Sequence, residues 1–242
     1  MSATGAALLM AVTLASSASL FAQHEVGAPP GRLVDVGGGR RIHVYCTGAG
    51  SPTVVLAAGA SAFAIDWALV QPEVARTNRV CSYDRAGHGW SDSSRVIETS
   101  ERSVADLHAA LAGAGERAPY VLVGASLAGL HIRIYELRYP NDVAGMVFVD
   151  PAHEDRLFTM FEGNAVAIAS LTSDQLRRTL PFYPVRVPRR SPQTGAPFDK
   201  LPHELYDLRV RLDERLIASI PDVITPQIIA ESQEAERAML AE

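Results

Sequence analysis

One serine stands among small residues in the run YVLVGASLAG, from Tyr120 to Gly129. The apolar residues before Gly124 predict a buried strand, and the pattern from Leu127 onward predicts a helix. A serine at such a sharp turn projects its hydroxyl from the edge of a sheet. The helix N-terminus then faces the negative charge that forms when the hydroxyl attacks a carbonyl. Ser126 is therefore the candidate nucleophile, and an ordinary serine N-cap on a helix is the alternative.

A second segment could stabilise the negative charge that such an attack creates. The run VVLAAGA, from Val54 to Ala60, predicts a buried strand that ends in a glycine turn. In acyl transfer, one N–H of the loop after such a strand and the N–H of the residue after the nucleophile bind the oxyanion. The predicted oxyanion-hole donors are Ala60 and Leu127, and a plain strand and loop is the alternative.

Two residues beyond a later predicted strand are candidates for the acid and the base. Asp150 follows the strand pattern Gly145–Val149, where a carboxylate could orient a catalytic histidine. The alternative, which we favour, is that the Asp150 carboxylate caps the turn at Pro151. His153 is the only one of the seven histidines that lies a few residues beyond such a strand. It could reach Ser126 if the turn folds inward, whereas most such histidines are solvated.

These residues need a sheet whose strand ends meet at one edge. Gly37–Gly39 joins two short strand patterns as a hairpin, and continuous apolar runs typical of buried strands follow. Helical patterns separate the runs, which predicts a mostly parallel sheet with helices on both faces and an antiparallel hairpin at its start. Strands are expected at Arg32–Val36, Arg41–Thr47, Thr53–Ala58, Arg79–Tyr83, Tyr120–Val123 and Gly145–Val149, and helices at Ser103–Ala112 and Leu127–Arg138.

Beyond this core the pattern changes. Residues 29–150 form the predicted core, with strands one to six, and residues 151–242 form a predicted helical cap or lid. No buried strand is evident in the cap, and the segment Pro181–Pro202 is rich in proline. The cap helices are expected at Asp155–Phe161, Ser173–Thr179, Glu204–Ala218 and Pro226–Leu240.

The start of the chain predicts a targeting segment. No charged residue occurs from Ala3 to Ala22, so residues 1–28 are interpreted as a signal peptide or membrane anchor with a linker. Export or membrane association through this segment is the expectation. The alternative is a buried or disordered N-terminal helix in a cytoplasmic protein.

Charge and cysteine content exclude other classes of function. The formal net charge is −5 and no long basic run occurs, which argues against nucleic-acid binding. Cys46 and Cys81 are the only cysteines, and no Cys/His spacing for zinc is present, so we expect no metal or organic cofactor. Both cysteines lie in predicted strands, where inert buried thiols are expected; export would allow a disulfide.

Three motifs together resemble the alpha/beta-hydrolase family. The segment SYDRAGHGWSD, from Ser82 to Asp92, is similar to that family's D-R-x-G-x-G-x-S segment after the fourth strand, and the nucleophile turn follows at the family's spacing. The segment DVAGMVFVDPAHED, from Asp142 to Asp155, is similar to its sixth strand and exit. At Ala58 and Ala125 the chain lacks histidines that the family carries, without losing a catalytic group.

The resemblance implies a three-layer α/β-hydrolase core under a helical cap. It implies acyl transfer from a small-molecule substrate to water through a Ser126 acyl-enzyme. Carboxylic esters are the expected substrates, with amides, lactones and carbon–carbon cleavage as alternatives. It also implies that the second and fourth strands are neighbours, so Cys46 and Cys81 should be close. We expect them to be unbonded, because cross-strand bridges are usually strained.

The family's last two strands, its triad acid and its histidine have no matching pattern before Glu242. The alternative expectation is therefore a truncated hydrolase-fold protein whose catalysis is impaired. Missing strands would leave the sixth strand as an apolar sheet edge, which favours self-association.

Overall fold

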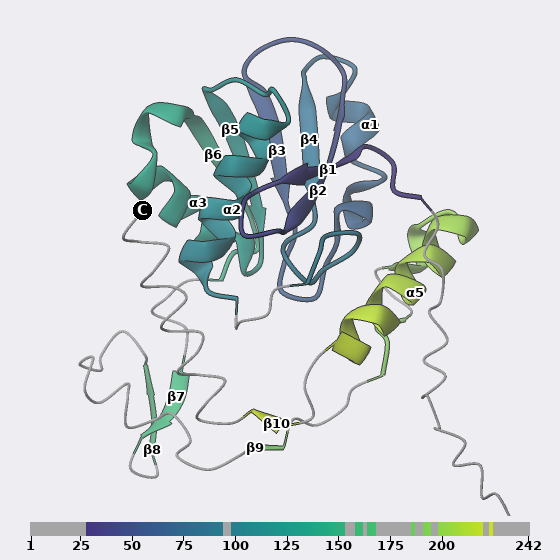
Figure 1. Ribbon diagram of the computed structural model, residues 1–242, viewed down its shortest axis with the longest axis vertical. Helices are drawn as coiled ribbons and strands as arrows, with labels where there is room; N and C mark the ends of the chain where they lie inside the picture. Colours follow the sequence, from purple (N-terminus) through teal and green to yellow (C-terminus); the bar gives the residue numbers. More distant parts are fainter. Residues whose placement is uncertain are drawn as a thin grey trace, which may run out of the picture.

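The core of the protein is a six-stranded sheet with helices packed on it (Figure 1). The computed structural model describes residues 28–93, 98–152, 158–161, 164–167, 185–186, 191–194, 198–219 and 223–224. The strands are β1 (Arg32–Asp35), β2 (Arg41–Thr47), β3 (Thr53–Ala57), β4 (Val80–Tyr83), β5 (Tyr120–Ala125) and β6 (Val143–Val149), and the helices around them are η1 (Ala64–Trp67), α1 (Gln71–Val74), α2 (Ser100–Gly113), α3 (Ala128–Arg138) and η2 (Pro140–Asp142).

The strand order is β1-β2-β4-β3-β5-β6. The pairs β1–β2 and β2–β4 are antiparallel, and the pairs β4–β3, β3–β5 and β5–β6 are parallel. This order confirms the predicted α/β class, a mostly parallel sheet that begins with an antiparallel hairpin. In a parallel sheet the carboxyl ends of β3 and β5 meet at one edge, which is where the predicted catalytic residues follow.

Alternate residues of the strands face two different helical layers, as the period of two requires. In β2, Ile42 and Val44 belong to the apolar cluster that includes the buried side chains of α2 and α3. The intervening His43 and Tyr45 face the side on which η1 and α1 lie. The sheet is therefore the middle of three layers, as predicted.

A further helix, α5 (His203–Ser219), packs against η1. Arg209 of this helix is fully buried, and its Nε donates a hydrogen bond of 2.7 Å to the Asp66 carboxylate in η1. A buried charge is stable only with such a partner, so this ion pair ties α5 to the core. The apolar contact beside it consists of Phe63, Ile65, Trp90, Leu212 and Leu216.

The described residues beyond residue 150 are only partly helical. Helix α5 confirms the helix predicted at Glu204–Ala218. The helix predicted at Asp155–Phe161 is wrong at residues 158–161, which form the strand β7 and pair with the strand β8 (Asn164–Ala167). Aromatic and β-branched residue types, such as those at positions 158 and 159, favour extended backbone. Pairing with a neighbouring strand then satisfies the backbone hydrogen-bonding groups of residues 158–161.

Five short elements complete the described part of this region: β7 (Phe158–Phe161), β8 (Asn164–Ala167), the paired strands β9 (Val185–Arg186) and β10 (Val223–Ile224), and the 3-10 helix η5 (Phe198–Lys200). The helices predicted at Ser173–Thr179 and Pro226–Leu240 lie outside the described residues.

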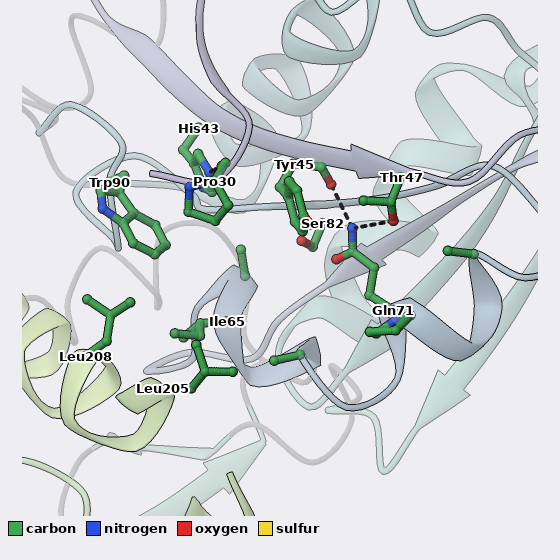
Figure 2. Close-up of a pocket in the computed structure, with 14 residues that line it drawn as sticks. Pro30, His43, Tyr45, Thr47, Ile65, Gln71, Ser82, Trp90, Leu205 and Leu208 are labelled. Carbon is green, nitrogen blue, oxygen red and sulfur yellow. Dashed lines mark hydrogen bonds between the residues drawn. The ribbon is translucent and has the colours of Figure 1, made fainter. Parts of the chain in front are cut away.

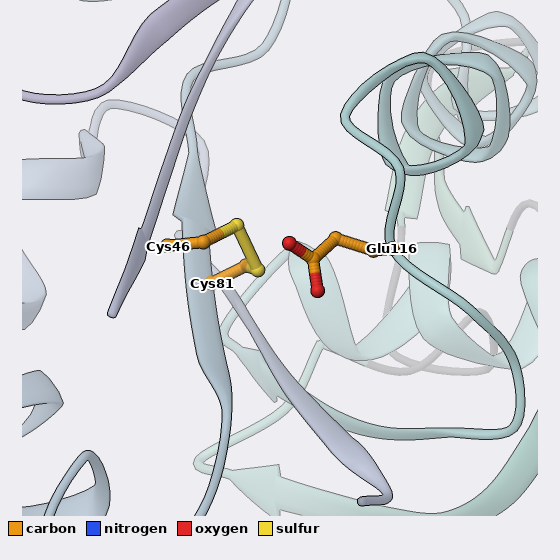
Figure 3. A group of neighbouring side chains, drawn as sticks. All are labelled: Cys46, Cys81 and Glu116. Atoms are coloured by element: carbon orange, nitrogen blue, oxygen red, sulfur yellow. A yellow bond between two sulfur atoms is a disulfide. The ribbon is translucent and has the colours of Figure 1, made fainter. Parts of the chain in front are cut away.

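Cys46 and Cys81 form a disulfide, which corrects the expectation of unbonded thiols (Figure 3). They are direct partners in the β2–β4 register, and their Cα atoms are 4.0 Å apart. This proximity places the two sulfur atoms within bonding range. Glu116 lies beside the bridge, where its carboxylate accepts a hydrogen bond of 2.7 Å from Arg79. Because both sulfur atoms are bonded to each other, this group offers no thiolate for a metal.

Strand β6 ends the sheet order among the described residues. Its Val147, Phe148 and Val149 side chains are 43–48% exposed. Self-association at this edge stays a prediction. The apolar segment Ala3–Ala22 lies outside the described residues, and within these residues no helix is long and apolar enough to span a membrane.

Strand β5 and helix α3 approach so closely at Gly124 that a side chain would not fit. A Cβ added to Gly124 would lie 2.6 Å from the Ala128 carbonyl oxygen and 2.9 Å from Ile132 Cδ1. By contrast, a Cβ added to Gly145 in the adjacent strand would meet no atom within 4 Å. The crossing of strand and helix therefore requires glycine at position 124 but not at position 145.

We expect Gly124→Ala to lower the free energy of unfolding by about 1–3 kcal/mol, because the methyl group forces strand and helix apart. Gly145→Ala is the matched control and should change it by less than about 0.5 kcal/mol. Urea unfolding of both variants measures the difference. Equal effects of the two substitutions would show that the crossing is not tightly packed.

Candidate active site

Ser126 lies at the turn between β5, which ends at Ala125, and α3, which begins at Ala128. Its backbone has φ of 50°, in the left-handed region that few residues other than glycine adopt, and its side chain is exposed. The Ser126 N–H donates a hydrogen bond of 3.1 Å to the Val149 carbonyl of β6. The neighbouring strand thus holds the turn in its strained shape. The predicted position of Ser126 is confirmed, while its role as nucleophile stays a prediction.

The loop after β3 passes directly beside the Ser126 side chain. A Cβ added to Gly59 would lie 3.1 Å from Ser126 Cβ and 3.7 Å from Ser126 Oγ. On the other side of the turn, a Cβ added to Gly129 would lie 2.5 Å from Pro151 Cβ. Three segments therefore converge on Ser126, and glycine is what lets them do so.

Ala60 follows Gly59, which lies beside Ser126, and Leu127 follows Ser126 directly in the chain. Neither the Ala60 N–H nor the Leu127 N–H donates a hydrogen bond to another described residue. The Gly59 carbonyl accepts a hydrogen bond of 2.7 Å from the Arg85 guanidinium. In a trans peptide the carbonyl and the following N–H point in opposite directions, so this bond turns the Ala60 N–H away from Arg85. The geometry is compatible with the predicted oxyanion-hole donors, whose function is a prediction.

Arg85 was not among the residues that the sequence singled out, yet it anchors this loop. Its guanidinium also donates a hydrogen bond of 2.7 Å to the Ala60 carbonyl, and His88 Nε2 lies 2.9 Å from the same oxygen. Burial lowers the pKa of the Arg85 guanidinium, and burial together with the Arg85 charge lowers the pKa of His88. The signal in the sequence was an arginine two residues after a buried strand and close to two glycines, where a buried guanidinium needs hydrogen-bond acceptors.

Asp150 lies beside the Ser126 turn, at the same edge of the sheet. It follows β6, in which Val149 is the register partner of Ala125, and its φ is 43°. Its exposed carboxylate forms no hydrogen bond with another described residue, so neither the orienting role nor the capping role is tested. His153 lies outside the described residues. Within the described part of the chain, no histidine is hydrogen bonded to the Ser126 hydroxyl.

His131 is buried in α3, and its Nδ1 atom has no hydrogen-bond partner. Burial, together with the charges of Arg85 and His88, lowers the pKa of His131 to about 4. The ring is therefore neutral at neutral pH. It adds no positive charge behind the turn that carries Ser126.

Comparison with known proteins agrees with this architecture. The model of the alpha/beta hydrolase family matches residues 54–240. The uncharacterized protein YbdG of Bacillus subtilis (strain 168) is 26% identical over 152 residues, which cover 59% of this chain and 46% of that protein. The uncharacterized protein YqjL of the same organism is 30% identical over 108 residues, which cover 45% of this chain and 43% of that protein. The chain thus spans less than half the length of these two relatives.

A solved structure described as Est816, an N-acyl homoserine lactone degrading enzyme, is also similar. It superposes with a TM-score of 0.52 and 20% identity, covering 83% of this chain and 70% of that one. At this identity the likeness concerns the fold alone.

The low pKa of His131 predicts a pH dependence of stability. Its native pKa of about 4 lies below the roughly 6.5 of an unfolded histidine, so below pH 6.5 the unfolded state binds a proton that the native state does not. Acidification from pH 7 to pH 5 should therefore cost about 2 kcal/mol through this residue. We expect His131→Leu to remove that part of the pH dependence in urea unfolding experiments.

His203→Leu is the control, because the His203 side chain is exposed on α5. This variant should keep the wild-type pH dependence. If His131→Leu and the wild type lose stability equally between pH 7 and pH 5, His131 is not buried as a neutral ring.

Proposed function

The chain belongs to the alpha/beta hydrolase family, and we propose that it is a serine hydrolase that cleaves carboxylic esters through an acyl-enzyme on Ser126. The observation that carries the proposal is the exposed Ser126 side chain at a strained strand-to-helix turn. The N–H groups of Ala60 and Leu127, which donate to no other described residue, support the same chemistry. Amides and lactones are cleaved by the same steps and are the nearest alternative substrates.

In the proposed reaction, Ser126 Oγ attacks the ester carbonyl carbon and gives up its proton to a base. The carbonyl oxygen becomes an oxyanion, which accepts hydrogen bonds from the Ala60 and Leu127 N–H groups. Collapse of this intermediate breaks the bond to the alcohol, which leaves with the proton. Water then attacks the acyl-enzyme in the same way, and the carboxylic acid and free Ser126 are released.

The proposed reaction needs a base beside Ser126. A histidine has to reach hydrogen-bond distance of Ser126 Oγ, and none of the described histidines does so. In the sequence, Asp150 and His153 follow shortly after β6, and we propose them as the acid and the base. Since no described histidine lies within hydrogen-bond distance of Ser126 Oγ, a second candidate is a hydrolase-fold protein with impaired catalysis.

Ester hydrolysis separates the two candidates. For a serine hydrolase we expect saturable turnover of p-nitrophenyl acetate, and Ser126→Ala should lower kcat/KM by roughly 10³-fold or more, because the covalent route is lost. Ser51→Ala, on an exposed loop before β3, is the control and should match the wild type. Wild-type turnover no faster than that of Ser126→Ala would reject the hydrolase and support impaired catalysis.

A further inference from the structure

Two sulfur atoms and a carboxylate come together at one end of the β2–β4 pair. Cys46 belongs to β2, Cys81 belongs to β4, and Glu116 lies in the connection between α2 and β5. The two sulfur atoms and a carboxylate oxygen of Glu116 all lie within 4.8 Å of one another. Figure 3 shows the carboxylate pointing toward the two sulfur atoms. Sulfur and carboxylate oxygen are both ligands that Zn²⁺ binds in proteins.

The register of the sheet holds the two cysteines opposite each other whether or not they are bonded. Cys46 and Cys81 are direct partners, and the pairs on either side of them, Tyr45–Ser82 and Thr47–Val80, belong to the same antiparallel ladder. Opening the bridge therefore leaves both sulfur atoms side by side. In a tetrahedral zinc site, neighbouring ligand atoms are roughly 3.5–3.8 Å apart. Small rotations of these side chains reach that spacing.

The charges around the group favour a divalent cation once the sulfur atoms are free. Two thiolates and the Glu116 carboxylate carry three negative charges, and Arg79, which donates a hydrogen bond of 2.7 Å to Glu116, carries one positive charge. A divalent cation makes the group neutral. The Glu116 side chain is 7% exposed and Cys81 is 1% exposed, so water screens these charges weakly. A carboxylate has about four lone-pair sites, which allows Glu116 to bind Arg79 and a metal ion together.

We propose that reduction of the Cys46–Cys81 bridge converts this group into a Zn²⁺ site, with the two thiolates and Glu116 as ligands and water in the fourth position. A dithiol reductant exchanges with the bridge, becomes a disulfide itself and leaves its two hydrogens on the two sulfur atoms. Zn²⁺ then replaces both thiol protons, which pass to the solvent. The oxidised chain has no such site. The group is separate from Ser126, and the proposal does not depend on the proposed function.

Zinc uptake by the full chain in its two redox states tests the proposal. One sample stays oxidised, and the other is reduced with tris(2-carboxyethyl)phosphine, which takes an oxygen from water while the two protons of that water pass to the sulfur atoms. The phosphine is removed under nitrogen, and both samples are dialysed against Zn²⁺ for elemental analysis. We expect one more Zn²⁺ ion per reduced chain than per oxidised chain. With Co²⁺ as the probe, only the reduced chain should show thiolate-to-cobalt charge-transfer absorption.

Equal uptake of Zn²⁺ by the two forms, or no uptake by the reduced form, overturns the proposal. Near-ultraviolet circular dichroism of the reduced chain shows whether the ligands are still held by the folded sheet. We expect the spectrum of the oxidised chain to persist in its main features, because the β2–β4 ladder remains. Loss of this spectrum that Zn²⁺ does not restore also overturns the proposal.

Two substitutions in one ion pair separate metal binding by Glu116 from a structural role. Glu116→Gln should weaken Zn²⁺ binding by the reduced chain at least about 10-fold, because a carboxylate ligand is lost. Arg79→Gln breaks the same ion pair, yet it should bind Zn²⁺ at least as tightly as the wild type, because a positive charge beside the ion is removed.

Glu73→Gln is the matched control, because Glu73 forms an exposed ion pair with Arg76. This variant should bind Zn²⁺ like the wild type. Wild-type affinity in Glu116→Gln would show that Glu116 is not a ligand. An equal loss of affinity in Glu116→Gln and Arg79→Gln would show that the ion pair acts only through folding. Either result contradicts the proposal.

Discussion

The structure depends on the close approach of backbones at the end of β5. Gly124 lies against the first turn of α3, where a side chain would not fit, and a Cβ added to Gly59 would lie only 3.1 Å from Ser126 Cβ. Between this strand and helix, Ser126 adopts a left-handed conformation with φ of 50°. The hydrogen bond from Ser126 N–H to Val149 then joins this turn to β6. Exposure of the serine hydroxyl is thus a consequence of packing in the sheet.

A buried polar network holds the loop that faces this turn. Asp84, which is 1% exposed, accepts hydrogen bonds from the backbone N–H groups of Ala64 and Trp90, and it is paired with His43. The next residue, Arg85, binds the carbonyls of Gly59 and Ala60. Two adjacent residues after β4 therefore fix both the start of η1 and the loop before it. Helix η1 also forms a wall of a pocket of about 570 Å³ between the sheet, α1 and α5 (Figure 2). The candidate active site and this pocket therefore share one rigid support.

The sequence predicted those features that depend on interactions between residues close together in the chain. The run around Ser126 specified a strand, a turn and a helix, because apolar periodicity and small residues act over a few positions. The Cys46–Cys81 disulfide was not predicted. The two cysteines were expected to be close but unbonded, because whether the sulfur atoms come within bonding range depends on the exact β2–β4 register. The role of Arg85 and the proposed metal site were missed for the same reason, since each combines groups from distant elements. For Asp150 and His153, the strand end was predictable, but the direction of the chain beyond it depends on tertiary contacts.

The central claim is that Ser126 is the reacting nucleophile. Its most direct test is to treat the full chain with a fluorophosphonate, digest it and locate the adduct by tandem mass spectrometry. A nucleophilic serine beside an oxyanion hole reacts far faster than the other serine hydroxyls, which stay protonated and unassisted. The account predicts a phosphonate adduct on Ser126 alone. Prolonged treatment that leaves Ser126 unmodified, or that modifies another serine instead, would contradict it.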